Sequence, residues 1–302
     1  MKKYKVWFLL IMCNLFWAGN YIFGSFVVKE ISPLWVTLLR WLLGIFILYP
    51  IAYRVEKPKL KTIKQSLGPL AIMGFLGIVT YNQTLYAALN YTSTTNTALI
   101  NALNPGTILL FSVLLLREKV SKMQILGIAI SFVAVLVVLT GGNLEQIFMM
   151  EYNKGDILML FAIIVWSLYS IVARYVSRTV PPITATSVSA TIAIIILAPF
   201  ALRQGININN ISPLTIIGVL YIVIFASVGS FVFWNTAIKE IGASRAGVFM
   251  NLGPVFTALI NLFLGIRVTG AQVVGGIFVF LGVYLTTGML EEKLQKLARA
   301  SS

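Results

Sequence analysis

Long apolar runs separated by short polar segments recur along the whole chain. Each run holds about 20 mainly apolar residues, the length that a helix needs to cross a bilayer. The runs are roughly twice as long as the strands of a membrane barrel, and apolar and polar positions do not alternate within them. The pattern therefore predicts an all-α membrane protein. The ten predicted transmembrane helices cover residues 6–26, 33–52, 66–88, 94–116, 121–140, 155–174, 182–201, 212–238, 243–265 and 270–290.

The sequence contains an internal repeat at a shift of 149 positions. Three of the five prolines in the first half fall on prolines in the second half. Because each half holds an odd number of predicted helices, five, the second half enters the membrane from the opposite side. Such an inverted repeat is the architecture of many secondary transporters. The positions that the shift relates include Trp17 and Trp166, Pro33 and Pro182, Pro50 and Pro199, Leu103 and Leu252, Pro105 and Pro254, and Gly127 and Gly276.

The repeat divides the chain into three predicted parts. Residues 1–145 form a first five-helix repeat, residues 150–290 form a second one, and residues 291–302 form a cytoplasmic tail. The connections between the spans are short, which leaves no room for a separate soluble domain. A static membrane scaffold that does not alternate between two states is an alternative that also fits a duplication.

The composition agrees with a protein whose surface faces lipid. Hydrophobic residues make up 59% of the chain, charged residues 11%, and the mean hydropathy is +0.92. A typical soluble protein carries about 25% charged residues. The single cysteine, Cys13, excludes a disulfide framework and a multi-cysteine zinc site. Since the chain has no histidine, we expect no His-based catalysis, no metal site, no cofactor and no enzymatic activity.

The distribution of basic residues predicts the orientation in the membrane. A net charge of +14 would indicate nucleic-acid binding in a soluble protein. With the N-terminus placed inside, however, 18 Lys and Arg residues fall on the inner side and 4 on the outer side. Basic residues gather on the cytoplasmic side of membrane proteins. We therefore expect a multi-pass protein of the cell membrane with both termini in the cytoplasm and no nucleic-acid partner.

The N-terminal segment MKKYKVWFLLIMC has two possible interpretations. Its basic start and apolar stretch also occur in signal peptides, but no small-residue cleavage site follows cleanly. Met12 precedes Cys13, where a bacterial lipoprotein would carry a small residue. We interpret the segment as a retained first helix.

Short motifs stand in the first, second, fourth and ninth predicted helices. They are 15–20 (LFWAGN), Arg40, 97–105 (TALINALNP) with 116–119 (LREK) after it, and 246–254 (AGVFMNLGP). In these motifs the chain resembles the EamA-type ten-helix group of the drug/metabolite transporter superfamily, over nearly its whole length. The resemblance implies an exporter of amino acids, metabolites or other small organic compounds, and it does not identify the substrate.

One position departs from the pattern of that family. Its members commonly carry a Glu after the ninth helix as well as after the fourth. Here the shift of 149 positions takes Glu118 to Arg267. The sequence therefore does not support a symmetric gating role for two acids.

Polar and aromatic residues gather on single faces of six predicted helices. In the fourth helix, Thr97, Asn101 and Asn104 recur at the spacing of one helix face. The six stripes predict one hydrated cavity that binds a solute. Alternatively, the amides and hydroxyls hold helices together and the aromatic rings are helix contacts or interfacial anchors. The candidate binding residues are Asn14, Trp17, Tyr21, Tyr81, Asn82, Tyr86, Thr97, Asn101, Asn104, Trp166, Tyr169, Ser230, Trp234 and Asn251.

Pro105 and Pro254 lie in the middle of the predicted fourth and ninth helices. A proline removes a backbone hydrogen bond and frees the carbonyl one turn earlier, here at Asn101 and Met250. We expect two kinks that serve as gating hinges or offer a carbonyl to the substrate. The alternative is a pair of static bends.

Arg40 is the one charged residue well inside a predicted span. A buried guanidinium can attract the carboxylate of a substrate. It can also bond backbone carbonyls or extend toward the interface. The sequence leaves both roles open.

All nine acidic residues lie outside the predicted spans or at their ends. Proton-driven pumps commonly use a buried carboxylate, so its absence argues against such a relay and against multivalent cations as substrates. We expect facilitated export of small neutral or zwitterionic metabolites or amino acids by alternating access, with the lipid bilayer and the solute as the partners. A lipid or lipid-linked sugar flippase and a non-transporting scaffold are the alternatives, and the oligomeric state is not predicted.

Overall fold

The structure is a computed structural model that describes residues 3–89, 91–92, 94–149, 153–206, 211–263, 265 and 267–290. The predicted tail, 291–302, lies outside the described residues. Within those residues all regular secondary structure is helical, and six helices are long and apolar enough to cross a membrane. The helical segments in chain order are α1 (Lys3–Glu30), α2 (Pro33–Val55), α3 (Leu60–Gln65), α4 (Leu67–Gly74), η1 (Phe75–Thr80), α5 (Tyr81–Leu89), α6 (Thr94–Asn101), α7 (Asn104–Leu116), α8 (Lys122–Leu139), η2 (Leu144–Ile147), α9 (Lys154–Val176), α10 (Pro182–Gln204), α11 (Pro213–Tyr221), η3 (Ile222–Gly229), α12 (Ser230–Ile241), α13 (Ala243–Val248), η4 (Phe249–Asn251), α14 (Leu252–Phe263) and α15 (Gly270–Thr286).

Prolines fix where three of the long helical segments begin. Pro33, Pro182 and Pro213 each occupy the first helical position of α2, α10 and α11. Proline suits this position because its fixed φ is helical and its missing N–H would have no partner there. Ser32 and Ser212 cap α2 and α11 by accepting the N–H of the residue three positions further on. The predicted starts at 33, 182 and 212 agree with these helices to within one residue.

The predicted fourth helix is broken, whereas the predicted ninth helix stays continuous but tightens into a 3₁₀ turn. α6 ends at Asn101 and α7 begins at Asn104, while α13 passes through the 3₁₀ turn η4 into α14. Pro105 and Pro254 lie in the first turn of α7 and α14. The expectation of a kinked but continuous helix was therefore wrong for the fourth helix, while the ninth is continuous through η4. Each irregularity comes just before the proline, which has no backbone N–H to donate and is therefore tolerated in the first turn of a helix.

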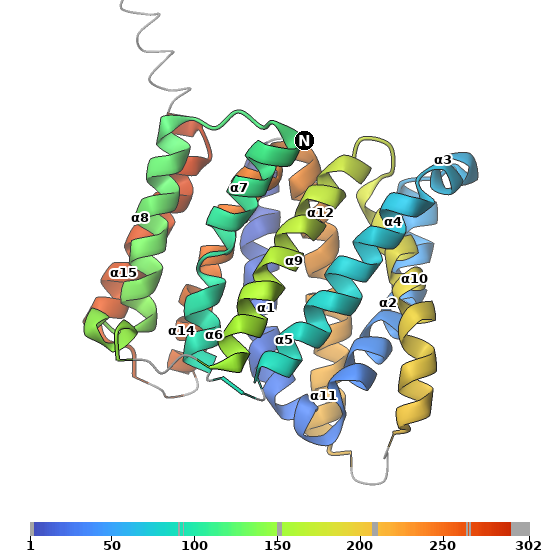
Figure 1. The fold of residues 1–302 in the computed structure, drawn as a ribbon, viewed down its shortest axis with the longest axis horizontal. Coiled ribbons are helices and arrows are strands. Elements are labelled where there is room, and N and C mark those ends of the chain that lie inside the picture. The colour runs from blue at the N-terminus through green and yellow to red at the C-terminus, as the bar shows by residue number, and fades with distance from the viewer. Residues whose placement is uncertain are drawn as a thin grey trace, which may run out of the picture.

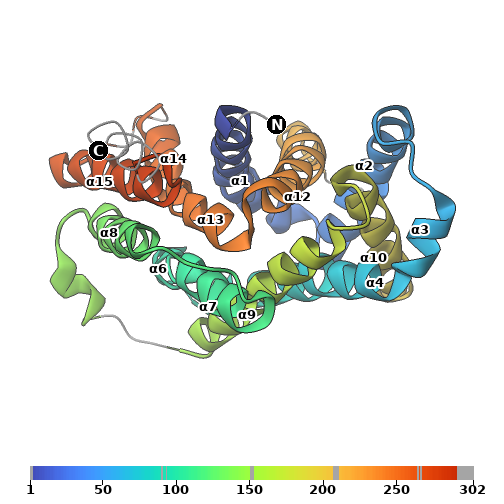
Figure 2. The same ribbon diagram turned by 90° about the horizontal axis from the view of Figure 1, so that it is seen from above.

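The helices lie in two layers, and each layer draws on both halves of the chain (Figure 2). In one layer α1 lies between α12 and α14, and in the other α9 lies between α5 and α7. α1 runs downward from the N-terminus in Figure 1, and α9 runs upward. At the two ends of the molecule, α8 packs against α15 and α2 packs against α10. Helices related by the 149-residue shift thus occupy equivalent places in the two layers.

α8 and α15 approach each other at two glycines. A Cβ added to Gly127 would lie 2.5 Å from the carbonyl oxygen of Gly282, and one added to Gly282 would lie 2.6 Å from the carbonyl oxygen of Gly127. Backbones come this close only where side chains are missing on both helices. The pair joins a helix of the first repeat to a helix of the second.

Candidate functional site

Two adjoining cavities lie where the layers meet. Their volumes are about 310 Å³ and 40 Å³, and we call them the larger and the smaller cavity. Trp17, Asn20, Tyr21, Leu85 and Met250 line both of them. The cavities are therefore neighbours that share part of their walls, at the centre of α1 and beside the 3₁₀ turn η4 between α13 and α14.

The structure brings together most of the predicted binding residues. The larger cavity is lined by Asn14, Trp17, Tyr21, Tyr86, Thr97, Asn101 and Asn251, with Pro254. The smaller cavity is lined by Trp17, Tyr21, Tyr81, Asn82 and Trp166, with Arg40. The predicted residues that line neither cavity are Asn104, Tyr169, Ser230, Trp234 and Pro105.

Three of the residues outside the cavities connect helices. Ser230 Oγ donates to the carbonyl oxygen of Cys13 over 3.2 Å, which joins α12 to α1. Tyr169 donates to Asn235 Oδ1 over 3.0 Å, which joins α9 to α12. Asn104 donates to Asn101 Oδ1 across the break between α6 and α7. Each of these three side chains thus donates a hydrogen bond between or within helices, and Asn104 Oδ1 accepts none from the described residues.

Some amides line the larger cavity and hold helices together at the same time. Asn101 Nδ2 donates to the Tyr21 hydroxyl over 3.3 Å, which joins the end of α6 to α1. Asn251 Nδ2 donates to Ser131 Oγ over 2.9 Å, which joins η4 to α8. Packing and lining are therefore not exclusive at these positions, although the sequence presented them as alternatives.

Two π-helical segments, η1 and η3, stand at corresponding places in the two halves, and each is followed within two residues by a residue that lines the smaller cavity, Tyr81 and Phe231. In a π-helix, carbonyl groups lose their usual partner four residues on, and such segments are frequent at functional sites. Trp17 Nε1 donates to the carbonyl oxygen of Ala226 over 3.2 Å. Asn82 Nδ2 donates to the carbonyl oxygen of Ile78 over 2.8 Å. The two irregular segments thereby orient side chains that line the cavities.

An aromatic cluster lies beside the cavities. The ring centroids of Trp17 and Trp166 are 5.3 Å apart with their planes at 83°, so the tryptophans related by the repeat meet between the layers. Trp234 lies 5.8 Å and Tyr169 4.9 Å from Trp166. Trp166, Tyr169 and Trp234 are almost fully buried. The cluster fills the space between α1, α9 and α12.

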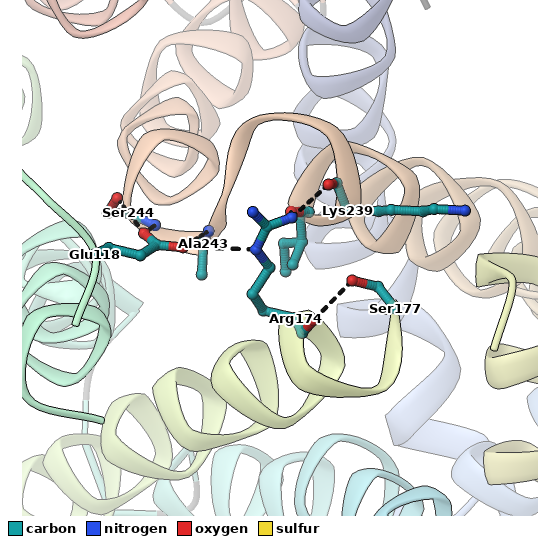
Figure 3. Close-up of polar contacts among 7 residues, drawn as sticks. Glu118, Arg174, Ser177, Lys239, Ala243 and Ser244 are labelled. Atoms are coloured by element: carbon teal, nitrogen blue, oxygen red, sulfur yellow. Dashed lines mark hydrogen bonds and ion pairs between the residues drawn. The ribbon is translucent and has the colours of Figure 1, made fainter. Parts of the chain in front are cut away.

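Beyond this cluster, Glu118 clamps the start of α13 (Figure 3). Its carboxylate accepts the Ser244 hydroxyl over 2.6 Å and the backbone N–H groups of Ala243 and Ser244 over 3.4 and 3.3 Å. Arg174 Nε pairs with the same carboxylate at 3.7 Å, and its Nη1 donates to the carbonyl oxygen of Lys239. A negative charge at the N-terminus of a helix is favourable because it satisfies free N–H groups. The clamp holds α7, α9 and the α12–α13 corner together.

Glu56 forms a second clamp of the same design. It accepts the backbone N–H groups of Ile183 and Thr184 over 2.9 and 2.7 Å, and the Thr184 hydroxyl over 2.7 Å. This joins the end of α2 to the start of α10. Both glutamates follow helices of the first half and cap helices of the second half, in segments that the charge distribution predicts to be cytoplasmic.

Asn20 is a residue of both cavities that the sequence reasoning missed, as it missed Thr257 and Gln272 of the larger cavity. It lines both cavities, and its buried Oδ1 accepts no hydrogen bond from the described residues. Its position next to Tyr21 places it at the edge of the stripe formed by Trp17 and Tyr21, so the spacing alone did not select it. The available signal was an amide inside an apolar span, which requires a reason. Across the described ranges, no three His, Cys, Asp or Glu side chains come together as a metal site.

An all-helical membrane protein with an internal repeat, and between the repeats a mainly apolar cavity that several amides line, has the architecture of a secondary transporter. The EamA-like transporter family matches residues 5–140 and again residues 153–288, and the chain belongs to this family. The two matched segments agree with a chain built from two EamA repeats. The protein is therefore a multi-pass membrane protein of a transporter family.

Curated relatives have similar lengths and carry transporter names. The chain is 29% identical to the uncharacterized transporter YyaM of Bacillus subtilis over 294 residues, which is 96% of each chain. It is 27% identical to an uncharacterized transporter of Archaeoglobus fulgidus over 285 residues, 94% of this chain and 97% of the relative. A solved crystal structure that is 19% identical superposes with a TM-score of 0.78 and covers 96% of this chain and 98% of its own. This last likeness shows the fold alone.

Proposed function

We propose that the protein is a secondary transporter that exports small organic metabolites or amino acids across the cell membrane by alternating access. The larger cavity carries this proposal. Its volume of about 310 Å³ is near the lower end of the range for small-molecule sites, roughly 300–1,000 Å³. Its walls combine apolar and aromatic surface with a few amides, as expected for a small solute with polar groups.

In this proposal the chain crosses the membrane ten times as an inverted repeat. α4, η1 and α5 form one span, as do α11, η3 and α12. The broken pair α6–α7 forms one span, and α13, η4 and α14 form another, which adds to α1, α2, α8, α9, α10 and α15. Discontinuous helices at the repeat interface are typical of transporter binding sites.

The conformation corresponds to an outward-facing state under the predicted orientation. The larger cavity reaches Val28, Thr97, Leu139 and Gln272, which lie at the helix ends predicted to be external. The aromatic cluster and the Glu118 clamp close the opposite end. An inward-facing state would require this clamp to open while the larger cavity closes.

We propose transport down a gradient without a buried-carboxylate proton relay. No Asp or Glu lines either cavity in the described part of the chain. Purified protein in proteoliposomes is expected to exchange amino acids or related metabolites at the same rate with and without a pH gradient. A gradient requirement would contradict the uncoupled mechanism. Lipid translocation would indicate a flippase instead, and no flux of any solute would indicate a scaffold.

Filling the larger cavity is expected to block transport. Gly24 lines this cavity, and a Cβ added there meets no atom within 4 Å, so Gly24→Phe places a ring in the empty space without displacing the backbone. We expect about a tenfold lower flux, corresponding to roughly 1.4 kcal/mol of lost substrate binding. Gly68→Phe is the matched control, because Gly68 has the same open surroundings and lines neither cavity. Equal flux in both variants would place the transport route elsewhere.

The break before Pro105 is expected to contribute to gating. Pro105→Ala supplies a backbone N–H and removes the ring, which allows α6 and α7 to join into one helix. We expect the initial rate of solute exchange to fall several-fold while the amount of folded protein stays near normal. Pro199→Ala serves as the control, because Pro199 lies inside α10 and lines neither cavity. An unchanged rate for Pro105→Ala would remove the proposed gating role.

A further inference from the structure

Arg40 is a buried cation whose partners in the described residues are neutral. Its side chain lies in α2 and is 3% exposed. Its Nε donates to Ser227 Oγ over 2.6 Å, and its Nη1 donates to Asn82 Oδ1 over 3.4 Å. Among the described residues, no carboxylate forms an ion pair with it. A guanidinium has five N–H donors, and Tyr86 also hydrogen-bonds this one, so three of the five are used and all three partners are neutral.

The smaller cavity lies directly against this guanidinium. Arg40, Asn82 and Tyr81 line it together. Its volume of about 40 Å³ has room for roughly three water-sized groups at ~10–15 Å³ each, which is the size of a carboxylate. The planar fork of a guanidinium matches a carboxylate by two parallel hydrogen bonds. A bound carboxylate would therefore supply the charge that this buried cation lacks.

Asn20 adds an acceptor to the same cavity. Its Oδ1 is buried and has no hydrogen-bond partner within the described chain. A buried acceptor without a donor is unfavourable, so this oxygen is suited to a ligand N–H group. A donor residue, Arg40, and an acceptor residue, Asn20, thus line one small space that adjoins the larger cavity.

We propose that the smaller cavity binds the carboxylate of an α-amino acid through Arg40, that Asn20 accepts from the ammonium where the two cavities meet, and that the substrate side chain extends into the larger cavity. The inference rests on the proposed transport function and adds the groups that would recognise the substrate. A phosphate fits less well, because it is larger and carries up to two charges. Arg40 is the only Lys or Arg among the described residues that line the two cavities.

Tryptophan fluorescence provides a direct measurement of binding, because Trp17 and Trp166 line the cavities. The full chain in detergent micelles would be titrated with each non-aromatic proteinogenic amino acid. The same titration would use the matching amide, the decarboxylated amine and the deaminated acid. We expect at least one amino acid to bind saturably and its amide and amine to bind at least tenfold more weakly, the usual scale for a hydrogen bond to a charged group.

Substitutions of Arg40 and Asn20 test the recognition of the carboxylate and of the ammonium separately. Arg40→Gln is expected to weaken binding of the amino acid and of the deaminated acid at least tenfold, and Arg40→Lys to give an intermediate loss because it keeps the charge without the fork. Asn20→Ala is expected to weaken binding of the amino acid but to leave the deaminated acid unchanged. If Arg40→Gln does not fold, Arg40→Lys and Asn20→Ala still provide the comparison.

Amides and amines that bind as tightly as the parent amino acid would overturn the inference, and so would the absence of binding by any amino acid. The failure of the transport proposal is a separate result. If carboxylate-free solutes cross the proteoliposome membrane and Gly24→Phe blocks their flux, the protein is a transporter and the head-group site is wrong. If no solute crosses but amino acids bind with the expected pattern, the site is correct and transport is wrong.

Discussion

Replacing Glu118 with Ala is expected to open the clamp at the predicted cytoplasmic end and to abolish most transport. The carboxylate accepts three hydrogen bonds from Ala243 and Ser244, and hydrogen bonds to a charged group contribute about 1.5–3 kcal/mol each. Two of these bonds are long and should contribute less. Arg174 is 29% exposed, so we assign little stabilising free energy to its ion pair with Glu118. A total loss of ~3 kcal/mol would shift the equilibrium between closed and open states by about 100-fold.

Cysteine labelling measures the opening of this end directly. The natural Cys13 is buried, and Cys13→Ser removes its background reaction. Ile108 is fully buried and lies 3.2 Å from the position of a Cβ on Gly247, between α7 and α13. In Ile108→Cys, we expect a maleimide to react much faster once Glu118→Ala is added, and Glu118→Gln to give an intermediate rate.

A buried position away from the clamp separates local opening from general unfolding. Val135 in α8 is also fully buried, and Val135→Cys should react slowly with or without Glu118→Ala. Equal reaction rates of Ile108→Cys in the two backgrounds would show that Glu118 does not keep this end closed. Faster reaction at both positions would indicate loss of the fold rather than opening of a gate.

The apolar runs and prolines were sufficient to predict most of the fold. A span of about 20 apolar residues is a local property, so it can be read without knowing what packs against it. The break before Pro105 and the 3₁₀ turn before Pro254 were harder to predict from the sequence. A proline inside an apolar run is compatible with a bend or an interruption, and the packing of α7 and α13 decides between them.

The clamps show what an internal repeat cannot predict. The shift of 149 positions relates Glu118 to Arg267 and therefore argued against a pair of gating acids. In the structure, the counterpart of Glu118 is Glu56. It lies in the same half of the chain and binds the start of another helix in the same way. This similarity depends on which helix starts lie nearby, and it is a tertiary property that the repeat spacing does not contain.

The site residues were predicted as far as the helix periodicity allowed. Helix periodicity placed Trp17 and Tyr21 on one face of α1 and Asn101 on the polar face of α6. All three line the larger cavity. The role of Arg40 stayed open because it depends on the absence of an acidic partner, which only the surrounding helices reveal. Asn20 was missed for a similar reason, since a buried acceptor is recognised by its lack of a donor.

Replacing Gly127 or Gly282 with Ala is expected to destabilise the fold strongly, against the usual trend. In a helix, Gly→Ala normally stabilises by roughly 0.5–1 kcal/mol. Here each new Cβ would lie 2.5 or 2.6 Å from a carbonyl oxygen of the facing helix, so α8 and α15 must move apart. Such overpacking costs about 1–3 kcal/mol, and more where backbone must shift.

The measurement is the denaturant midpoint of the purified protein in mixed micelles. Gly68→Ala is the control, because a Cβ at Gly68 meets no atom within 4 Å, and its stability should stay equal or rise slightly. The double variant Gly127→Ala with Gly282→Ala tests the mechanism further. Because both methyl groups separate the same two backbones, their combined cost should be smaller than the sum of the single costs. Single variants as stable as Gly68→Ala would show that α8 and α15 do not rely on this contact to join the two repeats.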